Sequence, residues 1–440
     1  MDKHIYDTYV SILRTELIHA LGCTEPIAIA YAAATARQVL GCEPEHIKVS
    51  CSGNIVKNVK GVTVPNSGGQ KGIAAAAVLG AIGGTAEKKL DVLADVTDAD
   101  RVRTRELCAA GFCDCELIEG AENLFIVIDA EGGGHTVRVE LQKYHTNITS
   151  ILKDGVEIPD NVSAENAAGG TESAQSGKTA ASAASPAPDK GLLSVKDILL
   201  FAEEVKIADI EEVLGDQIRC NSAISEAGMT APYGAEVGRT IAKYKDMEDV
   251  RIRAQAFAAA GSDARMSGCP LPAVINSGSG NQGITVTMPV LAYAEKYGFD
   301  QDRIYRGLAV ANLISIHIKR FIGNLSAYCG AVNAGCGAAC GIAWMLGYGE
   351  DVISRLITNS LATIGGMVCD GAKPSCASKI AAAVDTALLS LELAIDGHVF
   401  APGEGLVKND VEETIQSIGR MGRVGMKSTD IEILNIMLDK

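Results

Sequence analysis

Residues 366–379 read Gly-Met-Val-Cys-Asp-Gly-Ala-Lys-Pro-Ser-Cys-Ala-Ser-Lys, in a chain of 440 residues. This stretch places Cys369 and Cys376 seven residues apart, with a glycine and a proline between them, and Cys329 lies forty residues upstream. Three thiols from two segments of a chain that looks cytosolic indicate a metal or iron–sulfur site. If three cysteines hold a four-iron cluster, one iron lacks a protein ligand and can act as a Lewis acid.

Other interpretations of these cysteines are open. Zinc usually binds closer pairs, with roughly two to four residues between the cysteines, and three buried thiols near a turn need no metal. Spacing alone also allows Cys336 to replace Cys329 as the upstream ligand, since Cys336 and Cys340 lie on one helical face. The segment 331–343 is rich in Ala and Gly, so we expect these two cysteines to pack in the core.

The composition is that of a globular protein with an acidic surface. Hydrophobic residues make up 47% and charged residues 21%, and the net charge is -15. This charge argues against nucleic acid as a partner, because phosphate contacts need clustered Lys and Arg. The N-terminal stretch is charged and amphipathic, and no apolar run reaches the roughly 18 residues of a membrane span. We therefore expect a cytoplasmic protein with no membrane partner, whose cysteines stay reduced.

The pattern along the chain predicts an α+β fold, with a mainly helical cluster-binding catalytic domain and a smaller α/β subdomain that contains an antiparallel sheet. Residues 1–44 are expected to form N-terminal helices of the catalytic domain, and residues 45–160 the α/β subdomain. Residues 161–190 are rich in Ala, Ser and Gly, which predicts a flexible linker or insertion. Residues 191–440 are expected to form the helical iron–sulfur catalytic domain.

Shorter patterns predict individual elements. Strands are expected at 46–51, 58–64, 90–96, 124–130, 135–141 and 148–158. Helices are expected at 4–21, 25–40 and 70–83. Ser194 and Thr429 are candidate N-caps of later helices.

A second motif, Leu21-Gly22-Cys23-Thr24-Glu25-Pro26, places a thiol just before a predicted helix. The positive end of the helix dipole should lower the pKa of Cys23 and favour its thiolate. A thiolate suits a base, a nucleophile or a metal ligand. A simple helix-capping turn explains the same residues.

Three small polar loops offer neutral donors that suit a carboxylate. They are residues 52–54, residues 66–69 and the eight-residue run Asn-Ser-Gly-Ser-Gly-Asn-Gln-Gly at 276–283. Ordinary turns explain the first two well and the third less well, and Lys57 and Arg265 are nearby cations of a type that is usually solvated. The candidate substrate-binding residues are Ser52, Asn54, Asn66, Ser67, Gly68, Ser277, Ser279 and Asn281.

Taken together, five motifs resemble a known family. Cys-Asp-Gly-Ala-Lys-x-Ser-Cys-Ala-x-Lys at 369–379 looks like the cluster motif of the iron–sulfur L-serine dehydratases. With the motifs at 22–26, 52–54, 65–69 and 276–283 in the same order, the chain resembles the serine-dehydratase-like iron–sulfur family, and within it L-cysteine desulfidase most closely. The resemblance covers nearly the whole chain except the segment 161–190.

This resemblance implies a [4Fe-4S] cluster and no pyridoxal phosphate. It implies that Cys329, Cys369 and Cys376 are the cluster ligands and that Cys23 is the base for the Cα proton, a resting fourth ligand, or both in turn. The implied reaction is β-elimination from L-cysteine to pyruvate, ammonia and sulfide. The open iron is expected to bind the substrate carboxylate and polarise the leaving group.

Alternatives from the sequence are an L-serine dehydratase with the same mechanism, a non-catalytic iron–sulfur redox or iron sensor, and a metal-free protein whose thiols only pack. Both enzyme interpretations expect a small amino acid as the partner. The sequence leaves open whether the chain forms a homo-oligomer.

Overall fold

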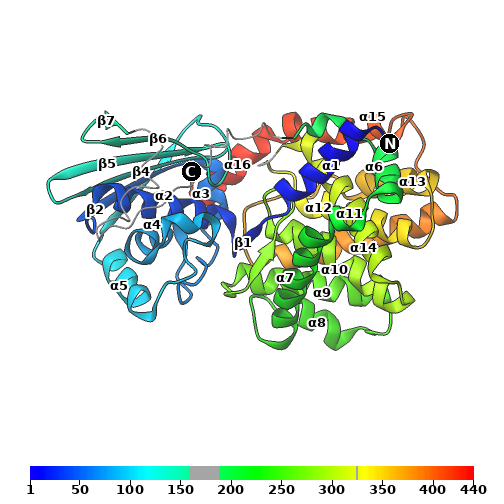
Figure 1. Ribbon diagram of the computed structural model, residues 1–440, viewed down its shortest axis with the longest axis horizontal. Helices are drawn as coiled ribbons and strands as arrows, with labels where there is room; N and C mark the ends of the chain where they lie inside the picture. The colour runs from blue at the N-terminus through cyan, green and yellow to red at the C-terminus, as the bar shows by residue number, and fades with distance from the viewer. Residues whose placement is uncertain (159–187, 324–325) are drawn as a thin grey trace, which may run out of the picture.

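The computed structural model describes residues 1–158, 188–323 and 326–440. Except for residues 188–190, the segment predicted to be a linker lies outside these residues. Two parts lie side by side (Figure 1). We call α2 to β7, residues 24–157, the sheet part, and α1 with α6 to α15, residues 3–16 and 195–420, the helical part.

A mixed sheet forms the frame of the sheet part. Its strands occur in the order β3-β2-β4-β5-β6-β7. Strands β2 and β3 are parallel, and the other neighbours are antiparallel. The bounds are β2 (His46–Ser52), β3 (Cys113–Ile118), β4 (Phe125–Gly132), β5 (His135–Gln142), β6 (Ile148–Lys153) and β7 (Val156–Glu157). The predicted α+β class is confirmed, and the sheet is antiparallel except for this one pair.

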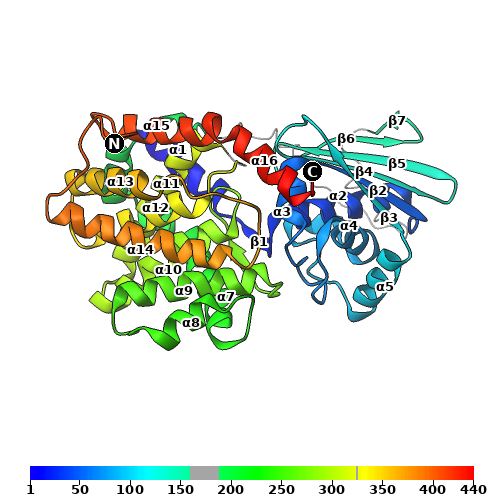
Figure 2. The ribbon, with the colours of Figure 1, turned by 180° about the vertical axis from the view of Figure 1, so that it is seen from behind.

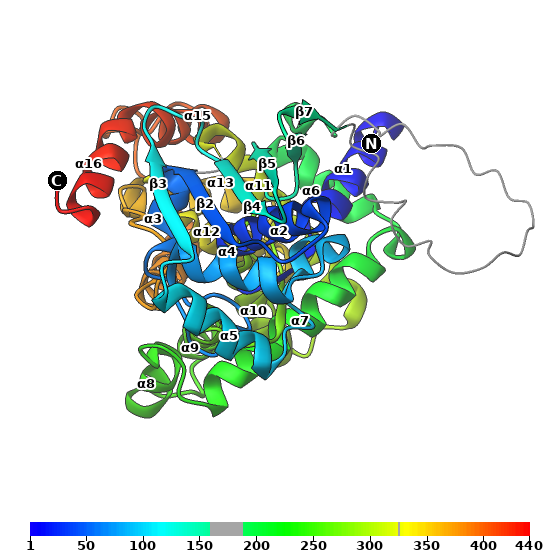
Figure 3. The ribbon, with the colours of Figure 1, turned by 90° about the vertical axis from the view of Figure 1, so that its left-hand side faces the viewer.

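Alternation along the strands gives the sheet one apolar face. Val137, Val139 and Leu141 of β5 are buried, whereas the residues between them are more exposed. Helices cover this face, and α2 packs directly on β4 and β5 (Figure 3). The helices of the sheet part are α2 (Thr24–Leu40), α3 (Gly53–Val59), α4 (Gly72–Gly83) and α5 (Asp98–Ala109).

The helical part has its own core, in which α11 packs extensively on α12. Small residues on α12 allow this close approach, because a side chain at Gly337 or Gly341 would overlap the backbone of α11. No helix within the described ranges has both the length and the apolar character needed to cross a bilayer. The helices are α1 (Lys3–Glu16), α6 (Val195–Glu204), α7 (Glu211–Thr230), α8 (Val237–Tyr244), α9 (Val250–Met266), α10 (Gly280–Tyr297), α11 (Gln301–Ile322), α12 (Gly330–Met345), α13 (Glu350–Ile364), α14 (Cys376–Ile395) and α15 (Val411–Arg420).

Two of the described segments join the parts. Strand β1 (His19–Leu21) pairs antiparallel with β8 (Pro272–Val274), so the segment that leads into α2 is fixed to the helical part. The last helix, α16 (Lys427–Met437), crosses back and packs on α3, as Figure 2 shows from behind. The N-terminus therefore lies on the helical part and the C-terminus on the sheet part.

Some local predictions were wrong. Helix α3 and the turn after it occupy 58–64, and a 3-10 helix (Ala86–Asp91) with turns occupies much of 90–96. Short apolar runs do not distinguish a strand from a buried helical turn. Ser194 is confirmed as an N-cap, since its side chain accepts a hydrogen bond from the Asp197 N–H. Thr429 instead lies inside α16, because a π-helical turn runs directly into this helix.

Candidate active site

A cavity of about 650 Å³ lies between the two parts. Residues 122–124 and 143–146 of the sheet part line one side, and the starts of α10 and α12 line another. The walls also carry all four cysteines singled out in the sequence, together with two buried cations. These six residues are Cys23, Cys329, Cys369, Cys376, Arg265 and Lys319.

Backbone pairing brings Cys329 and Cys369 together. Tyr328 and Val368 form an isolated antiparallel bridge. Around it, the Cys329 N–H donates to the Met367 carbonyl at 3.0 Å and the Cys369 N–H donates to the Ala327 carbonyl at 2.6 Å. Two segments forty residues apart therefore place their thiols beside the same cavity.

An ion-pair network holds the loop that leads to Cys376. Lys373 pairs with Asp370 at 2.5 Å, and Lys379 pairs with the same carboxylate. Although burial acts in the opposite direction, the two lysines lower the pKa of Asp370 to about 2. Cys376 itself begins α14 and lines the cavity.

The same loop lies against the sheet part at Gly371. Its φ is +95°, and a Cβ atom there would be 2.2 Å from the Lys57 carbonyl oxygen, so only glycine fits without strain. The Lys57 side chain is 2% exposed and pairs with Asp430 of α16. The loop with Cys369 and Cys376 is thus held from both parts.

Cys336 and Cys340 have a different environment. Both are fully buried in the helical core, and neither lines the cavity. Burial and the neighbouring Cys336 raise the pKa of Cys340 well above its usual value. The structure therefore distinguishes Cys329, at the cavity, from Cys336, which packs one helical repeat further along α12.

Lys319 supplies positive charge beside the thiols. It is 4% exposed and lines the cavity. Burial lowers its pKa to about 8, while Cys369 and Cys329 act in the opposite direction. Burial and Cys369 raise the pKa of Cys329 to about 12. A bound metal cation would favour the thiolate form of these cysteines. The buried ammonium of Lys319 favours it too, but less strongly.

These residues suit an iron–sulfur cluster by their chemistry, because such clusters are held by Cys thiolates. Cys329, Cys369 and Cys376 line one cavity of about 650 Å³, and the buried cation Lys319 lines it too. In a four-iron cluster each thiolate binds a different iron, so three thiols would leave one iron open.

Cys23 is a buried thiol, contrary to the predicted thiolate. It is the N-cap of α2, it is 2% exposed, and its thiol donates to the Glu25 carboxylate at 2.9 Å. Burial and Glu25 raise its pKa well above the usual value, which outweighs the helix dipole. Cys23 also belongs to a small apolar cluster against which Cys376 packs.

The loop at 276–283 reaches the cavity. Ser277, Ser279 and Asn281 all line it. Asn276 is fully buried and donates to the Asn312 side chain at 2.9 Å, which fixes the base of the loop. The structure thus brings this loop, Cys23 and the three other thiols together.

The other two polar loops lie outside the cavity. Among the described residues that line it, none comes from 52–54 or 66–69. Ser52 and Asn54 donate to Asn123, at 2.9 and 3.3 Å, and Asn123 does line the cavity. Asn66 donates to the Leu93 carbonyl, Ser67 donates to the Gln70 carbonyl, and Gly68 lies near Arg101. In this structure these residues support neighbouring segments.

Several other residues of the cavity wall carry little or no signal in the sequence. The sequence does point to Glu25, because it lies two residues after Cys23 in the same motif. His145 has no such signal, because a single histidine in a polar stretch is usually unremarkable. Its Nε2 atom is buried without a hydrogen-bond partner, and burial lowers its pKa. Lys319 reads in the sequence as one more cation near the end of an amphipathic helix.

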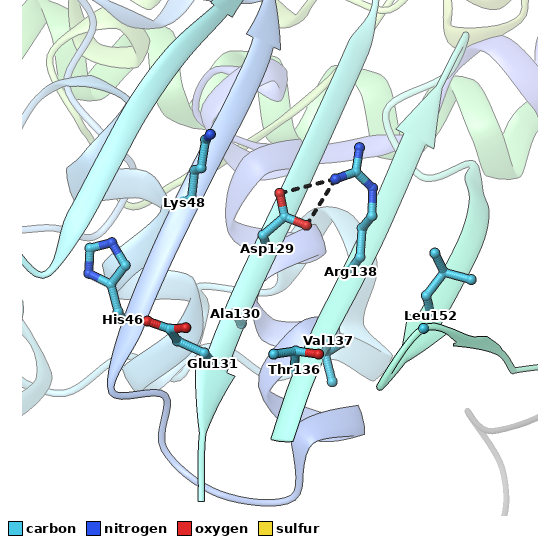
Figure 4. A pocket seen from close by; sticks show the side chains of 10 residues that line it. His46, Lys48, Asp129, Ala130, Glu131, Thr136, Val137, Arg138 and Leu152 are labelled. Carbon is cyan, nitrogen blue, oxygen red and sulfur yellow. Dashed lines mark hydrogen bonds and ion pairs between the residues drawn. The ribbon is translucent and has the colours of Figure 1, made fainter. Parts of the chain in front are cut away.

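A second cavity, of about 440 Å³, lies on the outer face of the sheet (Figure 4). Two of its charged side chains, Arg138 and Asp129, pair with each other at 3.0 Å, and Lys48 pairs with Glu116 of β3 at 2.9 Å. None of the predicted site residues lines it.

Comparisons with known proteins identify the family of the chain. The family described as serine dehydratase alpha chain matches residues 87–435. A UPF0597 protein of Desulfitobacterium hafniense is 47% identical over 435 residues, covering 99% of this chain and 97% of the relative. UPF0597 proteins of Finegoldia magna and Porphyromonas gingivalis are 46% and 35% identical, covering 98% and 100% of this chain and 99% and 100% of their own lengths. The chain therefore belongs to the serine dehydratase alpha chain family.

Proposed function

We propose that the protein is an iron–sulfur lyase that converts L-cysteine to pyruvate, ammonia and sulfide. The observation that carries this proposal is the shared cavity of Cys329, Cys369, Cys376 and Cys23, in a chain of the serine dehydratase alpha chain family. When bound by the first three thiolates, a [4Fe-4S] cluster supplies a Lewis acid for the substrate and its leaving group. The proposal needs no pyridoxal phosphate.

In this proposal Cys23 and Glu25 move the proton. The hydrogen bond places the Glu25 carboxylate where it can accept the thiol proton. Because burial and Glu25 hold that proton on Cys23, the transfer needs the positive charge of a cation bound in the cavity, and it leaves a thiolate. A thiolate whose acid form has a raised pKa is a strong base, as removal of a Cα proton requires. As that proton transfers to Cys23, the Cα–Cβ double bond forms and the Cβ–S bond breaks, releasing sulfide. The aminoacrylate becomes an imine, and water hydrolyses it to pyruvate and ammonia.

The polar loop orients the substrate. Ser277, Ser279 and Asn281 offer neutral hydrogen-bonding groups at the start of α10. Thr24 donates to the Gly278 carbonyl at 3.2 Å, so the loop and the Cys23 segment are in direct contact. A substrate held by the loop therefore lies close to the proposed base.

The alternative is the same elimination from L-serine, which the family description favours. Anaerobically purified protein should be assayed with cysteine, serine and threonine, measuring sulfide, pyruvate and ammonia. Our proposal expects the highest kcat/KM with cysteine. A higher kcat/KM with serine would establish the alternative, and no turnover by cluster-loaded protein would leave a non-catalytic role.

A further inference from the structure

Arg265 is a buried cation with unused donors. It lies in the last turn of α9, is 3% exposed and lines the cavity. Within the part of the chain that the structure describes, its one hydrogen-bonding partner is neutral: Nη1 donates to the Asn281 side-chain oxygen at 3.2 Å. Its Nε atom is buried without a partner. A guanidinium that is always charged, buried and unpaired is costly unless a ligand completes its hydrogen bonds.

The guanidinium points at the beginning of α10. A Cβ atom at Gly280 would lie 2.2 Å from Nε and 2.8 Å from Cζ of Arg265, so glycine leaves the room that this side chain uses. The Ser279 N-cap side chain makes no capping hydrogen bond. The first N–H groups of this 18-residue helix therefore face the same place as the guanidinium.

We propose that Arg265 and the start of α10 form the subsite for the α-carboxylate of the substrate, an inference that rests on the proposed function. One guanidinium matches one negative charge, and its planar fork matches the two oxygens of a carboxylate. A carboxylate has about four acceptor sites, so it can bind Arg265 and a Lewis acid together.

The subsite also fixes the position of the substrate Cα, which carries the proton to be removed. The carboxylate is bonded directly to Cα, so holding it at Arg265 keeps the Cα proton near the cavity wall. Arg265 and Cys23 line the same cavity. Arg265 is thereby a specificity residue that selects amino acids over amines of similar size.

Two thiol ligands distinguish recognition of the carboxylate from recognition of the ammonium group. 3-Mercaptopropionate keeps the carboxylate, and cysteamine keeps the ammonium. Binding of each to anaerobically purified protein should be measured by equilibrium titration, which needs no turnover. We expect Arg265→Gln to weaken 3-mercaptopropionate by about 10–100-fold, the range for a hydrogen bond to a charged group, and to leave cysteamine within about threefold. With cysteine, KM should rise far more than kcat falls.

Two further variants guard against a folding defect. Gly280→Ala keeps the arginine but fills the space beside Nε, and should weaken 3-mercaptopropionate in the same direction. Arg253→Gln, on the same helix, removes a half-buried arginine that pairs with Glu295 and does not line the cavity, and it should change the binding of neither ligand. Melting temperature and iron content establish that each variant is folded.

Unchanged binding of 3-mercaptopropionate in folded Arg265→Gln would overturn the subsite, as would equal weakening of both ligands. If wild-type protein turns over cysteine without this dependence on Arg265, the subsite fails and the proposed function stands. If the protein binds 3-mercaptopropionate through Arg265 but turns over no amino acid, the carboxylate site stands and the proposed function fails.

Discussion

The helical core beside the cavity and the outer face of the sheet expose charge to very different degrees. The helical part buries Arg265, Lys319 and Asp263, which are 3%, 4% and 0% exposed. The sheet part keeps ion pairs on its outer face, where Arg138 and Asp129 are 42% and 37% exposed. An exposed pair contributes about 0–1 kcal/mol, whereas an unpaired buried charge costs several. Two of the three buried charges line the cavity, so the electrostatic cost is concentrated where chemistry is expected.

The largest expected effect is loss of the cluster. Cys329→Ser, Cys369→Ser and Cys376→Ser should each lose bound iron and activity, because each removes one of three proposed ligands. Cys336→Ser and Cys340→Ser should keep both, since these thiols lie outside the cavity. Iron content and the anaerobic absorption spectrum measure this. Full iron in any of the first three would contradict the assignment, and loss of iron in Cys336→Ser with retention in Cys329→Ser would move the upstream ligand.

The next effect concerns Cys23→Ala. Loss of a general base typically reduces turnover by about 10²–10⁴-fold, and exchange of the Cα proton with solvent should fall with it. Iron content should stay normal. Cys51→Ala is a matched control, because it removes a fully buried thiol that does not line the cavity. Loss of the cluster in Cys23→Ala would favour a structural ligand, and normal turnover would exclude Cys23 from the mechanism.

A third effect tests the contact between the parts. Asp430→Asn should destabilise the fold by about 3 kcal/mol, because it leaves the Lys57 ammonium buried without its counter-charge. Glu432→Gln, at an exposed position of the same helix, should change stability little. Urea unfolding under anaerobic conditions compares them. If the double variant Lys57→Met/Asp430→Asn does not recover stability, the pair is not the cause.

The motifs that form much of the site could be predicted from the sequence. The pKa shifts of its buried groups could not. The family resemblance assigns the motif at 369–376, Cys329 and the 276–283 loop to one site. In the structure, residues from all three line one cavity. The bridge between Tyr328 and Val368 carries no local sequence signal, because it depends on tertiary packing. The helix dipole is expected to lower the pKa of Cys23, but burial and Glu25 raise it. This burial depends on how the two parts meet, which a local motif does not show.

The fourth prediction concerns Asp263, a buried carboxyl group of the helical part that does not line the cavity. Burial raises its pKa to about 6, against hydrogen bonds from N–H groups that include that of Gly238. A carboxyl whose folded pKa is raised stabilises the fold below its unfolded pKa near 4, and this contribution is lost as pH rises through 6. Asp263→Asn should therefore gain about 2 kcal/mol relative to wild type between pH 4 and 6. A pH-independent difference would show that Asp263 does not titrate in this range.

The smallest effect is expected on the outer face of the sheet. Arg138→Gln and Asp129→Asn should each change stability by about 0–1 kcal/mol, and their double-mutant coupling should shrink as salt rises, because water and ions screen an exposed pair. Arg138 also bonds Glu140 at 3.0 Å, so the cycle must be repeated with Glu140→Gln. Coupling above about 2 kcal/mol is typical of desolvated charges. Such a value would mean that this face is covered in solution, and the contrast between the buried charges near the cavity and the exposed pairs of this face would no longer hold.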